Sequence, residues 1–431
     1  MSSPASSAPP EIIDLILDFL HADHRTLFSA SLVARKWVPS ARFHAFHRIA
    51  LHHLPHPRQS LLVDNVQEFI DICASPLCTI VPAVHEVLLD IQVHFNFTPN
   101  LLRDVVDALH QAPVRKLVFV DHTPAVLRKP FKIGWIALKF PALNELVYHA
   151  LDQVAEDLLQ LAVDLPELRA LSIYSSSKEP AASALTRMKP FPVLETGTFA
   201  KLRTLRYRLY AKEGEEFLGW LGSLPSLETL DVWVFQAKHT GWGPVDNLNN
   251  FLAHDGAHIQ NMTLAMVYED HAPILSADWL FQPSGGTLDL SPLTNLCTLK
   301  LESHDAMSLC TTLASLPAGP RQTIITSFPR WPHRTDFSCP CDFATNLSVF
   351  STTMIMPQFQ RLARFDILVP AVFADEGREM LAQFFPRQMT QGVLRVWYCD
   401  GEEGQEGKWP PDSWEELCRV TFGVVQESPA D

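Results

Sequence analysis

A short apolar pattern recurs over most of this 431-residue chain and limits what the chain can fold into. Apolar residues hold positions 1, 4 and 6 of units such as VRKLVF at 114–119, LRALSI at 168–173 and LETLDV at 227–232. Other copies begin at residues 84, 143, 202, 259, 296 and 362, and a looser copy covers 393–398. The interval of 66 residues after the copy at 296 has room for another copy near 322–328. Because alternate residues of a strand face opposite sides, each unit predicts a short strand with one buried face.

Helical patterns lie between the predicted strands. Apolar residues recur at spacings of three and four in the segments 66–73, 101–109, 154–165, 217–221, 248–252 and 380–384. A short strand followed by a returning helix, repeated along the chain, resembles the leucine-rich repeat family. That resemblance implies an α/β fold over residues 51–400, an irregular leucine-rich repeat solenoid with parallel strands on its concave side and helices on its convex side. An open, doubly wound α/β sheet is the alternative fold.

The strand pattern also predicts a binding surface. Positions 4 and 6 of each unit face the core, so positions 5 and 7 face solvent on the concave side. An exposed tryptophan such as Trp233 is a favoured interface anchor, and Arg206 and Arg208 belong to a basic strip with Lys201 and Arg203. The alternative is that these charges only keep the sheet soluble and that a loop covers Trp233. The candidate client-binding residues are Tyr174, Arg206, Arg208, Asp231, Trp233, Lys300 and Glu302.

The segment before the repeats, PPEIIDLILDFLHADHRTLFSASLVARKW at 9–37, predicts helices. Pro10 suits the first turn of a helix that runs to Leu20, because its missing N–H would be unpaired there in any case. Asp23 is a good N-cap for a second helix to about Arg35, and a third helix restarts at Pro39. So short a segment is below the size at which one core is comfortably stable. We therefore expect part of its apolar surface to be covered by another molecule.

The same segment resembles the F-box, a short helical motif that docks on the Skp adaptor of cullin-based ubiquitin ligases. Pro10, Glu11 and the apolar residues of the first helix match the first half of the motif, and Leu32, Val33, Arg35, Lys36 and Trp37 match the second half. Residues 42–51 resemble the tail of many fungal members, whereas Pro9 stands where the family usually has leucine. The resemblance implies that the adaptor contacts Pro10, Ile12, Ile13, Ile16, Leu17, Leu20, Leu32, Val33 and Trp37. The alternative is an internal helical cap on the next domain.

Composition narrows the possible partners. A net charge of −14 disfavours bulk attraction to nucleic acid or to an anionic membrane. Residues 400–431 hold nine acidic and two basic side chains, which predicts a solvated, partly disordered tail or a docking segment. The polar residues 1–8 predict a disordered start with no secretory signal, and no apolar run is long enough to span a membrane. Eight scattered cysteines, including Cys339 and Cys341, match no metal motif and are typical of reduced thiols in the cytoplasm or nucleus.

No catalytic motif stands out. The chain has no nucleophile elbow, phosphate-binding loop or HExxH pattern, and the spacing of His44, His47, His52, His53 and His56 fits no helical zinc motif. We therefore expect neither enzyme activity nor a cofactor. The expected function is a substrate receptor, in which residues 9–50 bind the Skp adaptor and through it cullin, while residues 51–400 bind a client protein. The alternatives are a leucine-rich repeat scaffold independent of cullin and a hydrolase on an α/β sheet.

Overall fold

The computed structural model describes residues 9–20, 23–51, 66–91, 99–121, 133–150, 156–175, 194, 197–210, 217–236, 245–268, 288–302, 306–318, 322–327, 348, 350–370 and 381–399. The chain divides into two compact units, Met1–Leu202 and Arg203–Asp431. The division falls inside the repeats predicted from the sequence. Within the described residues, no helix is long and apolar enough to cross a membrane.

The first unit begins with three short α-helices, α2 (Pro10–Phe19), α3 (His24–Ser31) and α4 (Val38–Phe46), and a 3-10 turn η1 (Arg35–Trp37) joins the last two. As predicted, a proline starts the first helix and Asp23 caps the second, accepting a 3.1 Å hydrogen bond from the backbone N–H of Thr26. The second helix ends at Ser31 instead of near Arg35. The N–H groups of Leu32 and Val33 bond to carbonyls three residues back, which tightens and closes the last turn.

These helices form a core of their own, which we call the N-terminal module. Its buried residues come from all three α-helices, and partly buried side chains close its edges. The buried set is Ile13, Leu17, Leu27, Ala30, Ala41 and Ala45, and the partly buried set is Leu20, Trp37 and Phe46. Small alanines on α3 and α4 allow the helices to approach closely. The module thus buries one face of α2 without help from the repeats.

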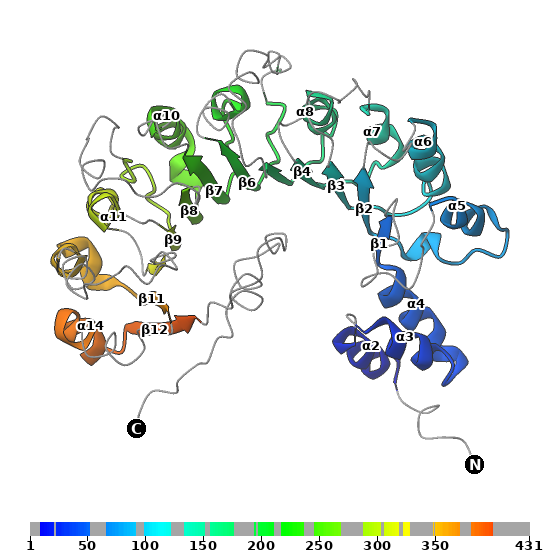
Figure 1. Ribbon diagram of the computed structural model, residues 1–431, viewed down its shortest axis with the longest axis horizontal. Helices are drawn as coiled ribbons and strands as arrows, with labels where there is room; N and C mark the ends of the chain where they lie inside the picture. The colour runs from blue at the N-terminus through cyan, green and yellow to red at the C-terminus, as the bar shows by residue number, and fades with distance from the viewer. Residues whose placement is uncertain are drawn as a thin grey trace. The chain divides into compact units, whose positions relative to one another are not determined.

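The repeats of the first unit follow the module. Parallel strands β1 (Arg48–Leu51), β2 (Glu86–Ile91), β3 (Lys116–Asp121), β4 (Glu145–Ala150) and β5 (Ala170–Ser175) pair in chain order. Helices α5 (Val66–Ala74), α6 (Pro99–Ala108), α7 (Trp135–Lys139) and α8 (Glu156–Val163) lie on one side of these strands (Figure 1), and a 3-10 turn η2 (Val81–Ala83) precedes β2.

The second unit continues the pattern. Its parallel strands are β6 (Thr204–Tyr210), β7 (Thr229–Gln236), β8 (Asn261–Tyr268), β9 (Thr298–Glu302), β10 (Thr323–Ser327), β11 (Arg364–Pro370) and β12 (Leu394–Cys399), again paired in chain order. Between them lie α10 (Val245–Asp255), α11 (Ala306–Ala314) and α14 (Pro386–Thr390), with 3-10 turns η5 (Gly256–His258) and η7 (Pro357–Arg361). Strand β10 confirms the copy predicted near 322–328.

The repeat pattern explains this architecture. In the copy at 168–173, the residues at positions 1, 4 and 6, Leu168, Leu171 and Ile173, are all buried. The carbonyl of Asn144, in the preceding copy, accepts hydrogen bonds from the backbone N–H groups of Arg169 and Ala170 at 2.8 and 3.0 Å. In the second unit, the backbone N–H groups of Glu228 and Thr229 bond in the same way to the carbonyl of Arg203, so neighbouring repeats within a unit are joined where their strands begin.

The strand order separates the two predicted folds. A doubly wound sheet reverses its strand order at a switch point and carries helices on both faces. In each unit the strands instead follow chain order. The predicted α/β architecture of repeated parallel strands and helices, consistent with a leucine-rich repeat solenoid, is confirmed, and the doubly wound alternative is wrong.

Candidate functional site

The outer face of α2 is an exposed apolar surface. Ile12, Leu15, Ile16 and Phe19 follow one another at helical spacing, and all four side chains are exposed, Phe19 to 89%. Leu32 and Val33, just after α3, are exposed as well, to 87% and 55%. We call these six residues the apolar face of the module. Leu15 and Phe19 were not among the predicted adaptor contacts, although the 12, 15, 16, 19 spacing could have identified them.

The structure divides the predicted adaptor contacts into three groups. Ile12, Ile16, Leu32 and Val33 lie on the apolar face. Ile13 and Leu17 are buried in the core of the module, while Leu20 and Trp37 pack partly buried against that core. Pro10 begins α2, but its side chain lies outside the described residues. The four exposed residues of the first group can therefore contact a partner directly. Ile13 and Leu17 cannot, and they pack beneath the exposed side of α2.

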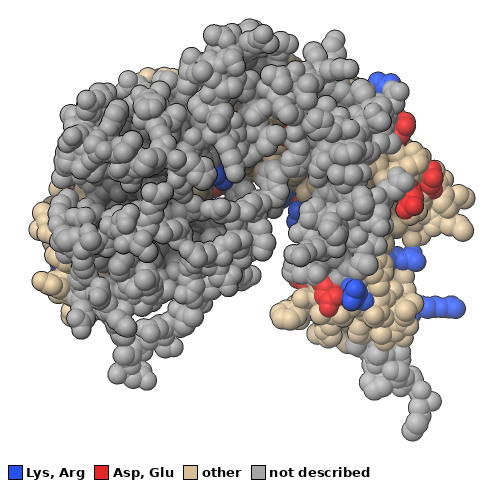
Figure 2. Space-filling model, viewed as in Figure 1, with Lys and Arg blue, Asp and Glu red and all other residues tan. Residues whose placement is uncertain are grey.

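Two acidic residues of α2 border the apolar face on one side. The exposed carboxylates of Asp14 and Asp18 lie on α2 and bond toward α4, since Ser40 donates to Asp14 and the His44 ring nitrogen lies 3.9 Å from Asp18. Figure 2 shows a largely uncharged surface over the described part of the module, with charged side chains at its margins. An exposed apolar patch with a polar rim is typical of a protein-interaction site.

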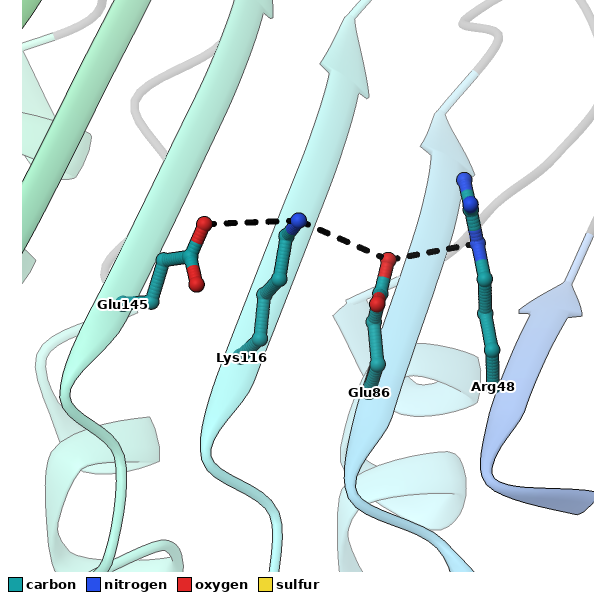
Figure 3. Close-up of polar contacts among 4 residues, drawn as sticks. All are labelled: Arg48, Glu86, Lys116 and Glu145. Carbon is teal, nitrogen blue, oxygen red and sulfur yellow. Dashed lines mark ion pairs between the residues drawn. The ribbon is translucent and has the colours of Figure 1, made fainter. Parts of the chain in front are cut away.

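In the first unit, an ion-pair ladder crosses the first four strands of the sheet (Figure 3). Arg48, Glu86, Lys116 and Glu145 hold equivalent register positions on β1 to β4. Glu86 Oε1 lies 3.2 Å from Arg48 Nε and 3.9 Å from Lys116 Nζ, and the same Lys116 nitrogen lies 3.3 Å from Glu145. Because opposite charges alternate from strand to strand, the ladder favours this register.

Next to the ladder, the strand face that points away from the helices is apolar in the first unit. Val118, Val120 and Val147 are buried there, with Leu88 and Tyr174 packed against them. Tyr174, predicted to face solvent, is half-buried, and its ring stacks on that of His149 at 4.8 Å between centroids. The 1, 4, 6 pattern does not predict these valines, because it predicts only one buried face for each strand. The run LVFV at 117–120 has no alternation and is typical of a strand that is buried on both faces.

The predicted basic strip is largely neutralised. In the second unit, Arg206 lies in register with Asp231, and Nε of the arginine donates a 3.0 Å hydrogen bond to that carboxylate. Arg203 lies 3.3 Å from Glu228. In the first unit, Lys201 pairs with Glu167 and lowers the pKa of that carboxyl. Carboxylates of neighbouring repeats therefore pair with three of the four cations of this strip, Lys201, Arg203 and Arg206.

The remaining predicted client contacts are less exposed than expected. Arg208 and Trp233 are register partners on β6 and β7, and both side chains are half-buried. Lys300 on β9 is half-buried too. Glu302 ends the same strand, and its side chain lies outside the described residues. This face thus holds Arg206, Arg208, Asp231 and Trp233 on two adjacent strands, as a polar surface that includes one ion pair and one tryptophan.

One of the histidines whose spacing fits no zinc motif, His47, lies at the end of the module next to His85, which precedes β2. The ring of His47 stacks on that of His85 at 4.8 Å, and Phe43 contacts both rings. Burial lowers the pKa of both imidazoles, so both favour the neutral form. Across the described part of the chain, no three His, Cys, Asp or Glu side chains come together as a metal site, and Cys339 and Cys341 fall outside that part.

Comparisons with known proteins add little to the description above. No protein-family model matches the chain, and no curated protein sequence matches it. Among solved structures, the chain is similar to the crystal structure of the leucine-rich repeat-containing protein LegL7 from Legionella pneumophila. The TM-score is 0.41 and the sequence identity 14%, over 88% of this chain and 99% of that chain. The assignment of the repeat architecture therefore rests on the strand order and register described above.

Proposed function

We propose that this chain is the substrate-recognition subunit of a Skp–cullin–F-box type ubiquitin ligase. The N-terminal module would dock on the Skp adaptor, and the repeats would hold a client protein. The observation that supports this most is the apolar face of the module, which stays exposed although the module has a complete core of its own. Together with the F-box-like sequence of residues 10–37, it favours a protein partner for this face.

The energetics of the apolar face support docking more than they support a structural role. Full burial of one aliphatic or aromatic side chain stabilises a complex by roughly 1.5–3 kcal/mol. Four such side chains on one side of α2, with Leu32 and Val33 exposed after α3, are enough for the centre of an interface, even after the cost of association is subtracted. The repeats do not use this face, because all six side chains remain exposed in the folded chain.

In this proposal the chain performs no covalent chemistry and needs no cofactor. Its contribution is to hold a client near the ubiquitin-transfer machinery, which converts a bimolecular encounter into a local one. The polar surface around Trp233 on β6 and β7 is the candidate client site. A net charge of −14 favours a protein client over nucleic acid or membrane, and the cytoplasm or nucleus is the proposed location.

Co-purification with a recombinant Skp adaptor tests the proposal. The variant Leu32→Glu places a charge on the apolar face at a position that is 87% exposed, so the fold should tolerate it. The matched control is Leu138→Glu on α7, at a position that is 85% exposed and distant from the module in sequence. Leu32→Glu should abolish co-elution with the adaptor, and Leu138→Glu should preserve it. If the wild-type chain does not co-elute with adaptor, the ligase role is wrong.

A repeat scaffold independent of cullin is the second candidate function. Pro9, which stands where the F-box family usually has leucine, favours it. Such a scaffold would keep its client and never bind adaptor. Proximity labelling with the full chain and with a Leu32→Glu variant separates the two functions. A ligase subunit should lose adaptor and cullin but keep its client, whereas a scaffold should give the same labelled proteins with both chains.

A further inference from the structure

A separate cleft opens on another side of the N-terminal module. It lies between α3, α4, α5 and the turn that follows α5, and its volume is about 420 Å³. Its walls are mainly apolar and include Phe28, Phe46 and Ile72, with Leu77 at the rim. None of the six residues of the apolar face lines it. The cleft is therefore distinct from the surface proposed to bind adaptor.

One cation lines this cleft. Arg42 on α4 donates a hydrogen bond of 2.5 Å from Nη1 to the Thr79 hydroxyl, and both residues line the cleft. Among the residues that the structure describes, no carboxylate forms an ion pair with Arg42, whereas Arg48, Arg203, Arg206 and Arg364 each have one. A guanidinium has five N–H donors in a planar fork, and a carboxylate fits that fork with two parallel hydrogen bonds.

We propose that the cleft binds a small organic acid. Its carboxylate would pair with Arg42 beside the Thr79 hydroxyl, and its alkyl or aryl body would lie between Phe28, Phe46 and Ile72. Small-molecule sites typically have volumes of roughly 300–1,000 Å³, mostly apolar walls and a few polar groups that orient the ligand, and this cleft has all three. A single cation in an otherwise uncharged wall selects an anion with one acidic group.

Octanoate and 1-octanol form a matched pair of probes, since they share an alkyl chain and differ in the acid group. Saturation-transfer NMR titrations of the full-length chain should give octanoate at least a tenfold lower dissociation constant than octanol, as expected for one hydrogen-bonded charge pair. Arg42→Gln should remove this difference and leave octanol binding unchanged. Ile72→Ser should weaken both probes. The controls are Arg25→Gln, an exposed arginine outside the lining, and Leu138→Ser, and neither should change binding.

Several results would overturn the proposal. They are equal affinities for the two probes, no binding of octanoate at millimolar concentration, or unchanged octanoate binding in an Arg42→Gln variant that keeps its circular dichroism spectrum. An acidic, apolar peptide such as acetyl-Leu-Phe-Glu-amide provides a further arm. If it bound through Arg42 and octanoate did not bind, the cleft would be a protein-docking site. Adaptor binding by Arg42→Gln should remain intact, so this test is independent of the ligase proposal.

Discussion

Replacing Leu17 by alanine should selectively destabilise the N-terminal module. The Leu17 side chain is 0% exposed and packs in the small core of the module. Truncation of a fully buried leucine costs about 2–5 kcal/mol, because the transfer free energy is lost and the remaining cavity collapses only in part. The module is too small to absorb such a loss easily.

The neighbouring residue is the matched control. Ile16 lies on the apolar face and is 43% exposed, so truncation to alanine removes only part of a burial term of roughly 1.5–3 kcal/mol, or about 1 kcal/mol. Both variants place alanine in the same turn of α2, and the replaced leucine and isoleucine differ in helix propensity by only a few tenths of a kcal/mol. The difference between the variants therefore measures mainly burial.

Hydrogen exchange followed by mass spectrometry reads out this difference. Since each 1.4 kcal/mol changes an equilibrium tenfold, Leu17→Ala should speed exchange of α2 to α4 by about 30-fold or more, up to the limit set by full opening of the module. Ile16→Ala should change it by less than about tenfold. Peptides from β3 to β5 should be unaffected in both variants. Equal acceleration by the two variants would refute the division of α2 into a core face and an outer face.

Three further predictions concern the repeats and their junction with the module. Burial holds the pKa of His47 and His85 below the ordinary value of 6.5, so the unfolded chain binds these protons first. The stabilisation that the neutral histidines give the junction should be fully present above pH 6.5 and should decrease as the pH falls below 6.5. Thermal unfolding scans at a series of pH values measure this decrease, and the variant His85→Phe should reduce the dependence of the melting temperature on pH. Arg364→Ala should destabilise the second unit by about 3–5 kcal/mol, because it leaves Asp366, which is 2% exposed, without its counter-charge. Hydrogen exchange of β11 measures this loss, and the double variant with Asp366→Ala should lose less stability. Lys116→Met in the ion-pair ladder should cost only about 1 kcal/mol or less in urea unfolding, and 1 M salt should reduce that cost; a larger, salt-independent loss would show that packing dominates.

The strand positions were predictable because their signal is local. In a unit such as LETLDV, Leu227, Leu230 and Val232 are buried as the alternation requires. The length of the interval after the copy at 296 suggested a further copy near 322–328, where β10 lies. The start of α2 and the N-cap of α3 were also local signals, since a proline and an aspartate act on the backbone next to them. These features needed no knowledge of distant residues.

The side-chain environments were less predictable because they depend on neighbouring repeats. Arg206 was predicted to belong to a basic strip, and only the register of β6 and β7 shows that Asp231 lies beside it. The outward-facing valines of β3 and β4 were missed for a related reason. A period-two pattern indicates which residues share a face, but it does not indicate whether that face is covered.

From the sequence alone, it follows that this chain has a helical N-terminal segment and repeated strands, because turn signals and apolar periodicity act within a few residues. Only the tertiary structure decided which side of α2 is core and which is exposed. That choice depends on where α3 and α4 place Leu27, Ala41 and Ala45, and these residues meet α2 only after the chain has folded back on itself. The tertiary structure also placed Arg42 beside a cleft, because α5 and its following turn come from a later part of the chain.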